Sequence, residues 1–242
     1  MGQIGKPLEG VYVRLGELSG NYHVRNKQMA ELILGGDCVS QGYINLPDKA
    51  DNFYTDGGIR WFHTGDAVIM HQDGSCELID HKSDIIKLEN GKCVPLGKLE
   101  SIYRMSEYVD NIYLHGNEGG KFLVSILIPD KDYISGLALS FGLSITSFSQ
   151  IYTELTIKTA VADLIAKHAK SCKLSAHEIP AAVMLVDHEW TIGSGLLTTN
   201  HQLKRSLVHE KYEAEIAFLY EELSKSQNNN DTKREITVIA GE

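Results

Sequence analysis

The chain has 242 residues, of which 23 are basic and 32 acidic, so its formal net charge is −9. A hydrophobic fraction of 43% with 23% charged residues is ordinary for a globular protein and excludes disorder over the whole chain. The acidic balance argues against a nucleic-acid-binding protein, which needs clustered Lys and Arg. No apolar run approaches the roughly 18 residues of a membrane span. The four cysteines form no Cys-x-x-Cys pair, which disfavours a structural zinc site and predicts reduced thiols.

The first third of the chain predicts short strands separated by turns. Alternating apolar residues indicate strands over 11–15 and 30–34, and a further strand over 60–66 that ends in a tight turn. A short helix is expected after 46–47, and a hairpin over 67–79. Eighty glycine-rich residues can hardly bury a complete core. We therefore expect a piece of a β-barrel or sandwich that needs further chain to complete it.

Beyond Asp80 the pattern changes to alternating helices and strands, which predicts an α+β unit. The expected elements are hairpins over 84–94 and 111–128, a helix after Pro95, an amphipathic helix over 147–170, a strand over 179–187 and a final helix over 202–223. From Ser224 onward the residues are mostly polar, and a disordered tail is predicted.

The first candidate site is the turn Thr64-Gly65-Asp66, placed at the end of a predicted strand. Glycine permits a sharp turn, and a carboxylate presented there can accept hydrogen bonds from both hydroxyls of a ribose. The structural alternative is an aspartate that caps its own turn.

The charged run Asp80–Asp84 lies at the change of composition. It is interpreted either as a solvated turn or as a hinge whose charged residues pair differently in two domain orientations.

A glycine-rich loop over 193–200 leads into Lys204 and Arg205 at a helix start. Thr198, Thr199 or Asn200 could cap this helix. Two cations near a helix N-terminus oppose the macrodipole, so the alternative is a cationic loop that neutralises a phosphate.

Together these segments resemble the long-chain fatty acid–CoA ligases of the adenylate-forming superfamily, over residues 1 to 223. The resemblance is carried by 2–7 (GQIGKP), 41–43 (QGY), 61–66 (WFHTGD), 73–74 (DG), 79–80 (ID), 86–88 (IKL), Gly91, 98–103 (KLESIY), 195–198 (GLLT) and 204–205 (KR). The family makes acyl-AMP from ATP and a fatty acid, with Mg²⁺ accompanying the ATP, and then transfers the acyl group to CoA. The family has a large N-terminal domain and a small C-terminal domain. The small domain rotates between the two half-reactions, so that one site serves both.

The resemblance assigns roles to particular residues. Asp66 would hold the ribose hydroxyls, with Thr64 and His81 also on the nucleotide. The hinge would comprise Lys82, Ser83 and Asp84. Lys87 and Gly91 would face the thioester-forming site, where Gly91 leaves room for the pantetheine arm of CoA.

Two positions depart from the family pattern. The arginine directed at ribose and phosphate is His81 here, and a neutral imidazole cannot supply the charged, forked donor of arginine. The adenylation lysine, whose charge would stabilise the meeting of two anions, falls on Gln202. Lys204 could substitute only after a shift in register, because two residues along a helix point to different sides.

We therefore expect an α+β chain from the C-terminal portion of such a ligase: a β-rich remnant of the AMP-binding domain over 1–80, the mobile domain over 81–223 and the polar tail over 224–242. The sequence lacks the family's phosphate loop and adenine loop. By itself the chain is expected to bind ATP, AMP and CoA weakly and to be inactive in adenylation, with any residual thioester chemistry supported by Lys87 and Gly91.

The alternative is a non-catalytic binding module that associates with a full-length synthetase or another partner. No protein-bound metal, nucleic acid or transmembrane segment is expected. The expected location is cytoplasmic, including peripheral contact with the endoplasmic reticulum or other lipid membranes.

Overall fold

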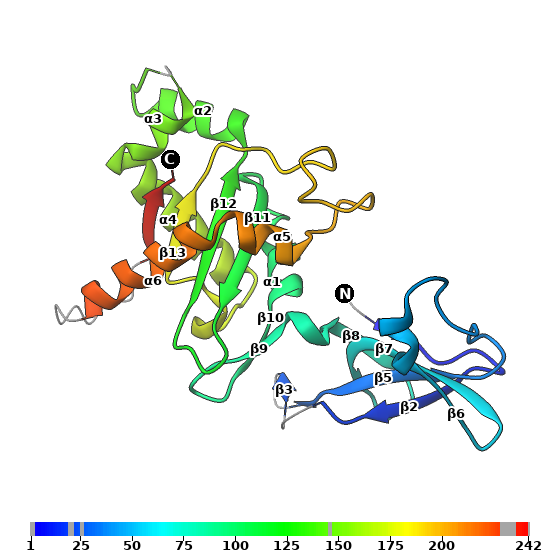
Figure 1. Cartoon of the computed structure of the whole chain (residues 1–242). Helices are drawn as coiled ribbons and strands as arrows, with labels where there is room; N and C mark the ends of the chain where they lie inside the picture. The colour runs from blue at the N-terminus through cyan, green and yellow to red at the C-terminus, as the bar shows by residue number, and fades with distance from the viewer. Residues whose placement is uncertain (1–2, 19–21, 25–26, 145–146, 228–235, 242) are drawn as a thin grey trace. The chain divides into compact units, whose positions relative to one another are not determined.

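The computed structural model describes residues 3–18, 22–24, 27–144, 147–227 and 236–241 (Figure 1). The chain divides into two compact units, Met1–Lys98 and Leu99–Glu242, and each is described by itself. The boundary predicted at residue 80 concerns a domain movement, and it stays a prediction.

The first unit is built on a six-stranded antiparallel sheet. Its strands are β1 (Gln3–Gly5), β2 (Tyr12–Gly16), β5 (Ala30–Gly35), β6 (Phe53–Asp56), β7 (Ile59–Met70) and β8 (Cys76–His81). The order is β1-β8-β7-β5-β2, and β6 pairs with β7. A 3₁₀ helix, η1 (Pro47–Asn52), precedes β6, and β3 (His23–Val24) pairs with β4 (Lys27–Gln28). The hairpin predicted over 67–79 is confirmed by β7 and β8.

A second hairpin packs against this sheet. The 3₁₀ helix η2 (Lys82–Asp84) leads from β8 into β9 (Ile85–Lys87), which pairs with β10 (Cys93–Pro95). Its side chains Ile85 and Cys93 join a buried cluster with Val24, Met29, Ala67, Ile69 and Ile79. Elsewhere in this unit large apolar side chains are exposed, among them Leu8 at 79% and Ile44 at 87%.

The second unit has a four-stranded sheet in the order β11-β12-β13-β14. The strands are β11 (Val109–Gly116), β12 (Leu123–Pro129), β13 (Ala182–Leu185) and β14 (Thr237–Ala240). Its helices are α2 (Lys131–Ser140), α3 (Phe148–Thr153), α4 (Leu155–Ser171), η3 (Ala176–Glu178), α5 (Arg205–Lys211) and α6 (Glu213–Gln227), while α1 (Leu96–Tyr103) begins in the first unit. The first strand pair is antiparallel and the others are parallel.

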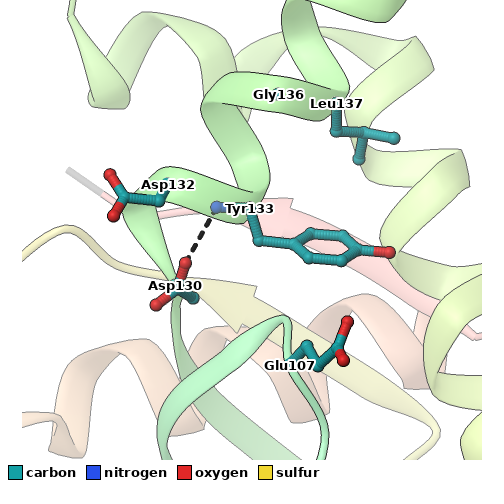
Figure 2. Close-up of a pocket in the computed structure, with 6 residues that line it drawn as sticks. All are labelled: Glu107, Asp130, Asp132, Tyr133, Gly136 and Leu137. Atoms are coloured by element: carbon teal, nitrogen blue, oxygen red, sulfur yellow. Dashed lines mark hydrogen bonds between the residues drawn. The ribbon is translucent and has the colours of Figure 1, made fainter.

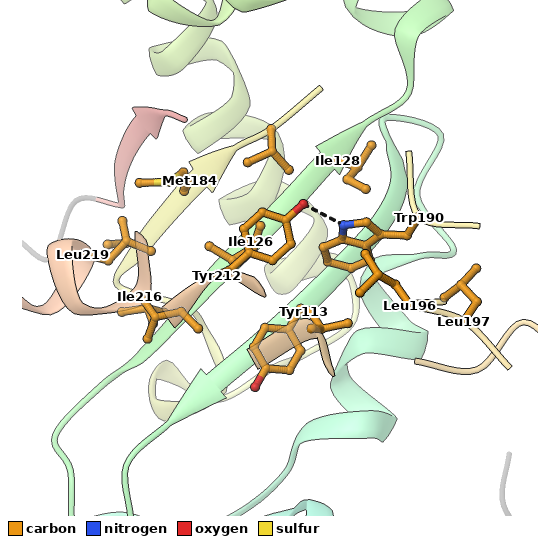
Figure 3. Packing of buried hydrophobic residues seen from close by; sticks show 14 residues of the cluster. Tyr113, Ile126, Ile128, Met184, Trp190, Leu196, Leu197, Tyr212, Ile216 and Leu219 are labelled. Atoms are coloured by element: carbon orange, nitrogen blue, oxygen red, sulfur yellow. Dashed lines mark hydrogen bonds between the residues drawn. The ribbon is translucent and has the colours of Figure 1, made fainter. Parts of the chain in front are cut away.

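Helices α5 and α6 cover one face of this sheet, and Figure 3 shows the core between them. Alternate residues of β12 and β13, such as Ile126 and Met184, meet Ile216 and Leu219 of α6 there. At the edge of the cluster the indole Nε1 of Trp190 donates to the hydroxyl of Tyr212 at 2.9 Å, which satisfies a polar group that burial would otherwise leave unpaired.

Two of the predicted long helices are interrupted. The helix predicted over 147–170 is α3 and α4, separated by Glu154, whose backbone is extended at φ −64°, ψ 124°. The helix predicted over 202–223 begins only at Arg205 and breaks at Tyr212. Helix α2 was not predicted from the sequence; Asp130 caps it by accepting from the amide of Tyr133.

The prediction of an unstructured polar tail over 224–242 is wrong in its described parts. Helix α6 continues to Gln227, and Thr237–Ala240 forms β14, which pairs in parallel with β13. The four residues of β14 comprise three β-branched side chains and an alanine, a composition that favours a strand, but they follow a long polar run in the sequence. Residues 228–235 lie outside the described residues.

Candidate functional site

The predicted turn at Thr64-Gly65-Asp66 is a bulge inside a continuous strand. Strand β7 runs on to Met70, so the expectation that the strand ends here is wrong. Between the pairs Ile33↔His63 and Glu31↔Ala67, β7 carries extra residues, and Gly65 takes a φ of +80°. The hydroxyl of Thr64 donates to the carbonyl of Leu32 at 2.8 Å and accepts from the amide of Asp66 at 3.0 Å. Bulges re-aim side chains, and this one sets the direction of Asp66.

His81 lies directly across the sheet from this bulge. Asp66 and His81 are register partners in β7 and β8, so their side chains share one face of the sheet. The ring also covers Gly65, because a Cβ added to this glycine would lie 2.5 Å from Nε2 of His81. The structure thus brings together three of the residues predicted at the nucleotide site: Thr64, Asp66 and His81.

The predicted hinge is held by short hydrogen bonds around η2. Nδ1 of His81 lies 2.7 Å from the hydroxyl of Ser83, and that hydroxyl donates to Oδ1 of Asp84 at 2.8 Å. Asp80 points instead at the start of α1, where its carboxylate accepts from the amide of Lys98 at 3.1 Å and from the amide of His81 at 2.9 Å. Burial raises the pKa of Asp80, whereas these backbone hydrogen bonds lower it in part.

Lys82 is tied to a buried carboxylate that the sequence analysis missed. Its Nζ lies 2.9 Å from Oε1 of Glu31, and Nδ1 of His63 lies 3.4 Å from Oε2. Glu31 is only 5% exposed. Burial by itself raises the pKa of Glu31, but the hydrogen bond and charge of Lys82, together with His63, hold that pKa below its ordinary value. The sequence contained one signal for this ion pair, because Glu31 is the only acidic residue in the apolar run 30–34. A carboxylate buried in such a strand needs a charged partner.

Lys87 and Gly91 lie on the β9–β10 hairpin of the first unit. The ammonium of Lys87 lies 5.9 Å from the ring centroid of Tyr22. Gly91 has a φ of +74°, and a Cβ added there would meet no atom within 4 Å. The turn therefore requires glycine for its backbone conformation, and the space beside it is open. Their predicted role in thioester formation stays a prediction.

Gln202 and Lys204 lie in an extended segment before α5. Thr198 and Gln202 close a turn through two hydrogen bonds, from the Thr198 amide to the Gln202 carbonyl at 2.8 Å and from the Gln202 amide to the Thr198 hydroxyl at 3.1 Å. Leu203 pairs with Leu197 and packs on the core. Because side chains alternate in an extended segment, the exposed Gln202 and Lys204 share one side. This corrects the expectation, based on a helix, that they point to different sides.

Arg205 has a structural partner in the second unit. Its guanidinium contacts both carboxylate oxygens of Glu100 at 2.8 Å and donates to the carbonyl of Leu114 at 2.7 Å. The charge of Arg205, which the sequence predicted to neutralise a phosphate, is therefore paired with the buried carboxylate of Glu100. Lys204, whose side chain is exposed and makes no cap hydrogen bond to the helix, is the cation left at this helix start.

An open cavity of about 530 Å³ lies elsewhere in the second unit (Figure 2). Glu107, Asp130 and Asp132 surround it together with Tyr133, Gly136 and Leu137. Asp130 serves as the cap of α2, and none of the predicted site residues lines this cavity. Within the described ranges, no three metal-ligating side chains gather closely enough to hold a metal ion.

Comparisons with known proteins found relatives that match most of this chain. The sequence is 35% identical over 225 residues to long chain acyl-CoA synthetase 8 of Arabidopsis thaliana, and 30% identical over 203 residues to long-chain-fatty-acid–CoA ligase 4 of Saccharomyces cerevisiae. These alignments cover 91% and 83% of this chain. Over about nine tenths of its length, the chain is similar to long-chain acyl-CoA synthetases. It spans about a third of the length of these relatives, at 31% and 29%, and no family model matches it.

The fold of this chain is that of solved adenylation domains. The A domain of a carboxylic acid reductase from Segniliparus rugosus, solved with AMP and a co-purified carboxylic acid, superposes with a TM-score of 0.72 at 22% identity. The match covers 88% of this chain and 32% of that chain. The predicted α+β architecture is therefore confirmed. Among the described residues, no helix is both long and apolar enough to cross a membrane.

Proposed function

We propose that this chain contributes the ribose-binding strand and the mobile domain of an AMP-forming long-chain fatty acid–CoA ligase. In the first half-reaction a fatty acid carboxylate attacks the α-phosphate of ATP, which gives acyl-AMP and pyrophosphate. In the second, the thiol of CoA attacks the acyl carbon, which gives acyl-CoA and releases AMP. Mg²⁺ would accompany the ATP. The cellular location that fits this substrate class is the cytoplasmic side of lipid membranes.

The observation that carries the proposal is the β7 bulge. Thr64 fixes the backbone on both sides of Gly65, through the carbonyl of Leu32 and the amide of Asp66. Asp66 is thereby presented at a rigid strand rather than on a loop, and a held carboxylate can accept from two adjacent hydroxyls without reorganisation. Beyond Asp66, β7 continues to pair with β8 as far as Met70, with one register shift between Ala67 and Val68.

Lys87 and Gly91 are proposed to serve the thioester step. Gly91 leaves the space next to its Cα open, and a slender pantetheine arm needs such space. Lys87 supplies a cation at the end of β9, just before the turn that contains Gly91. Its ammonium could attract the phosphates of CoA from this position.

The adenylation step is proposed to be slow, because Gln202 carries no charge. Lys204 shares its side of the extended segment and is the nearest substitute. Lys204 lies two residues further along the segment than the adenylation position. Its ammonium would therefore stabilise the charge that develops in the transition state less well, since Coulomb energy falls with distance.

The direct test is a hybrid in which this chain replaces the matching 225 residues of the Arabidopsis synthetase. With palmitate, ATP and CoA, we expect the hybrid to form palmitoyl-CoA slowly. The change Gln202→Lys should raise adenylation, measured as pyrophosphate release, by about 100-fold, as is typical when one transition-state contact is restored. Asp66→Asn should raise the KM for ATP, while Asp73→Asn, on the turn of the same hairpin, should not.

A second candidate is a non-catalytic module that associates with a full-length synthetase. The uncharged Gln202 favours it, because it removes the charge at the adenylation position. A hybrid that binds AMP but produces no palmitoyl-CoA, even with Gln202→Lys, would support this candidate and contradict the ligase proposal. Co-elution of the chain with the intact Arabidopsis enzyme would then test the association.

A further inference from the structure

Glu31 breaks the apolar pattern of its own strand. It lies in β5 between Ala30 and Leu32, and its side chain is only 7% exposed. Removing an ionised carboxylate from water costs free energy unless charged partners offset that cost. An apolar side chain at this position would avoid the cost. Residues that break a local folding rule are expected at functional sites.

The carboxylate of Glu31 joins strands that are not neighbours. Its Oε1 lies 2.9 Å from Nζ of Lys82, and its Oε2 lies 3.4 Å from Nδ1 of His63 in β7. Lys82 follows directly after β8, and β8 and β5 lie on either side of β7 in the sheet. The ion pair therefore spans β7 and ties the point where the chain leaves β8 to the strand beyond.

This tie acts where the chain changes direction. The 3₁₀ helix η2 leads into β9, the first strand of the hairpin that carries Lys87 and Gly91. No residue of η2 is buried, so burial of apolar side chains does not hold it in place. The hydrogen bonds of Ser83 to His81 and Asp84 stay within the turn. The contact of Lys82 with Glu31, in contrast, reaches the interior of the sheet.

Stability alone does not account for this pair. Removing one partner of a buried ion pair is destabilising, but replacing both by apolar residues of similar volume is often neutral or stabilising. The Lys82 side chain is 48% exposed, so the burial cost is carried mainly by Glu31. In some proteins such a pair instead selects one arrangement of the chain.

We propose that Glu31 is a positioning residue, which through Lys82 fixes the direction in which the chain leaves β8 and so places the β9–β10 hairpin for the thioester step. This rests on the proposed function, in which Lys87 and Gly91 serve that step. Because Glu31 acts only through Lys82, loss of the pair slows transfer of the acyl group to CoA and leaves formation of acyl-AMP unchanged.

The first experiment measures stability by urea unfolding of the full chain. Lys82→Met should lower the urea midpoint, because Glu31 stays buried without its main partner. Glu31→Leu combined with Lys82→Met should restore the midpoint at least to its original value. Asp56→Asn, which breaks the exposed ion pair with Arg14 in the same unit, is the matched control and should change little. A double variant no more stable than Lys82→Met would show that the pair serves stability and would overturn the proposal.

The second experiment measures amide hydrogen exchange in the same variants, without any substrate. In the double variant we expect exchange in η2, β9 and β10 to be about fivefold faster, the effect of losing one interaction of ordinary strength from a local opening. The strands β11 and β12 of the second unit should be unaffected. Lys82→Arg keeps a cation for Glu31 and should retain the original rates. Unchanged exchange in the double variant would overturn the proposal.

The third experiment separates the half-reactions in the hybrid with the Arabidopsis synthetase, carrying Gln202→Lys. Pyrophosphate release from ATP and palmitate measures acyl-AMP formation, and palmitoyl-CoA formation from supplied palmitoyl-AMP measures transfer. Loss of the pair should lower the kcat of transfer about tenfold to 100-fold, as a misplacement of about 1 Å can do, with pyrophosphate release unchanged. Lys82→Arg should rescue transfer. An equal loss in both half-reactions would indicate general damage and overturn the positioning role.

The outcomes separate the two claims. A hybrid that transfers palmitate equally well with and without the pair would overturn the role of Glu31 and leave the ligase proposal intact. A hybrid that makes no palmitoyl-CoA with the pair present would contradict the ligase proposal and the thioester role of the hairpin. The exchange rates of the full chain would still decide whether Glu31 holds the hairpin in place.

Discussion

Arg205 and Glu100 form an ion pair in which Nη1 of the guanidinium lies 2.8 Å from both carboxylate oxygens. The carboxylate is 3% exposed and also accepts from the amide of Leu114 at 2.7 Å. The pair joins α5 to α1 and β11 within the second unit.

Each unit holds one buried tryptophan, Trp61 in the first and Trp190 in the second. Unfolding of the two units can therefore be followed separately in Trp61→Phe and Trp190→Phe backgrounds.

Arg205→Ala is expected to destabilise the second unit by about 3–5 kcal/mol, because it leaves a buried carboxylate without its partner. Urea unfolding followed by Trp190 fluorescence measures this. The adjacent, exposed Lys204→Ala is the control and should change stability by less than about 0.5 kcal/mol. Equal effects of the two substitutions would show that the ion pair contributes little.

The stability of the second unit should fall as the pH rises from about 4.5 to 7. Burial raises the pKa of Glu100 to about 7, with Arg205 and the Leu114 amide acting against it. Between its ordinary value of 4.5 and 7, the folded state holds more of this proton than the unfolded state, so stability declines with rising pH. Glu100→Gln should flatten the profile over this range. A profile unchanged by this substitution would contradict the assignment.

Glu31 should give the opposite pH response in the first unit. Lys82 and His63 hold its pKa below the ordinary value against the effect of burial. Its contribution is fully present above pH 4.5 and is lost as the pH falls through the lowered folded pKa. In the Trp190→Phe background, Glu31→Gln should cost about 1–3 kcal/mol at pH 7 and less in acid. A constant cost across pH would mean that the charge of Glu31 is not involved.

Gly65→Ala should cost more stability than Gly91→Ala. Both glycines have positive φ, +80° and +74°, and a side chain in this region costs about 1–2 kcal/mol. Only at Gly65 would the added Cβ also meet the ring of His81, at 2.5 Å. We expect a further penalty of about 1–3 kcal/mol there, seen by urea unfolding. Combining Gly65→Ala with His81→Ala should remove the penalty caused by the contact with the ring and leave the penalty caused by the backbone conformation.

Much of the fold follows from local patterns. The hairpins were predictable because paired alternating runs flank Asp73-Gly74 or Asn90-Gly91, which favour tight turns. The helix after Pro95 was predictable because Leu99 and Tyr103 are spaced one turn apart, and both are buried. The helix breaks at Glu154 and Tyr212 were not, because neither residue is a glycine or proline and each break depends on tertiary packing.

The candidate site was only partly visible. Thr64, Asp66 and His81 were found in the sequence, but their meeting depends on the register of β7 and β8. The partners Glu31 and Glu100 are separated from Lys82 and Arg205 by 51 and 105 residues. Such pairs leave no local pattern, beyond an acidic residue placed where burial is expected.

Strand β14 gives the chain a practical vulnerability at its far end. Its four residues cover the outer hydrogen-bonding groups of β13, whose own side chains are all buried. Shortening the protein before Thr237 would convert β13 into an open, apolar edge, the kind that recruits strands from neighbouring molecules. Shortened forms should therefore precipitate during purification, and an affinity tag at this end calls for a spacer long enough to leave the pairing undisturbed.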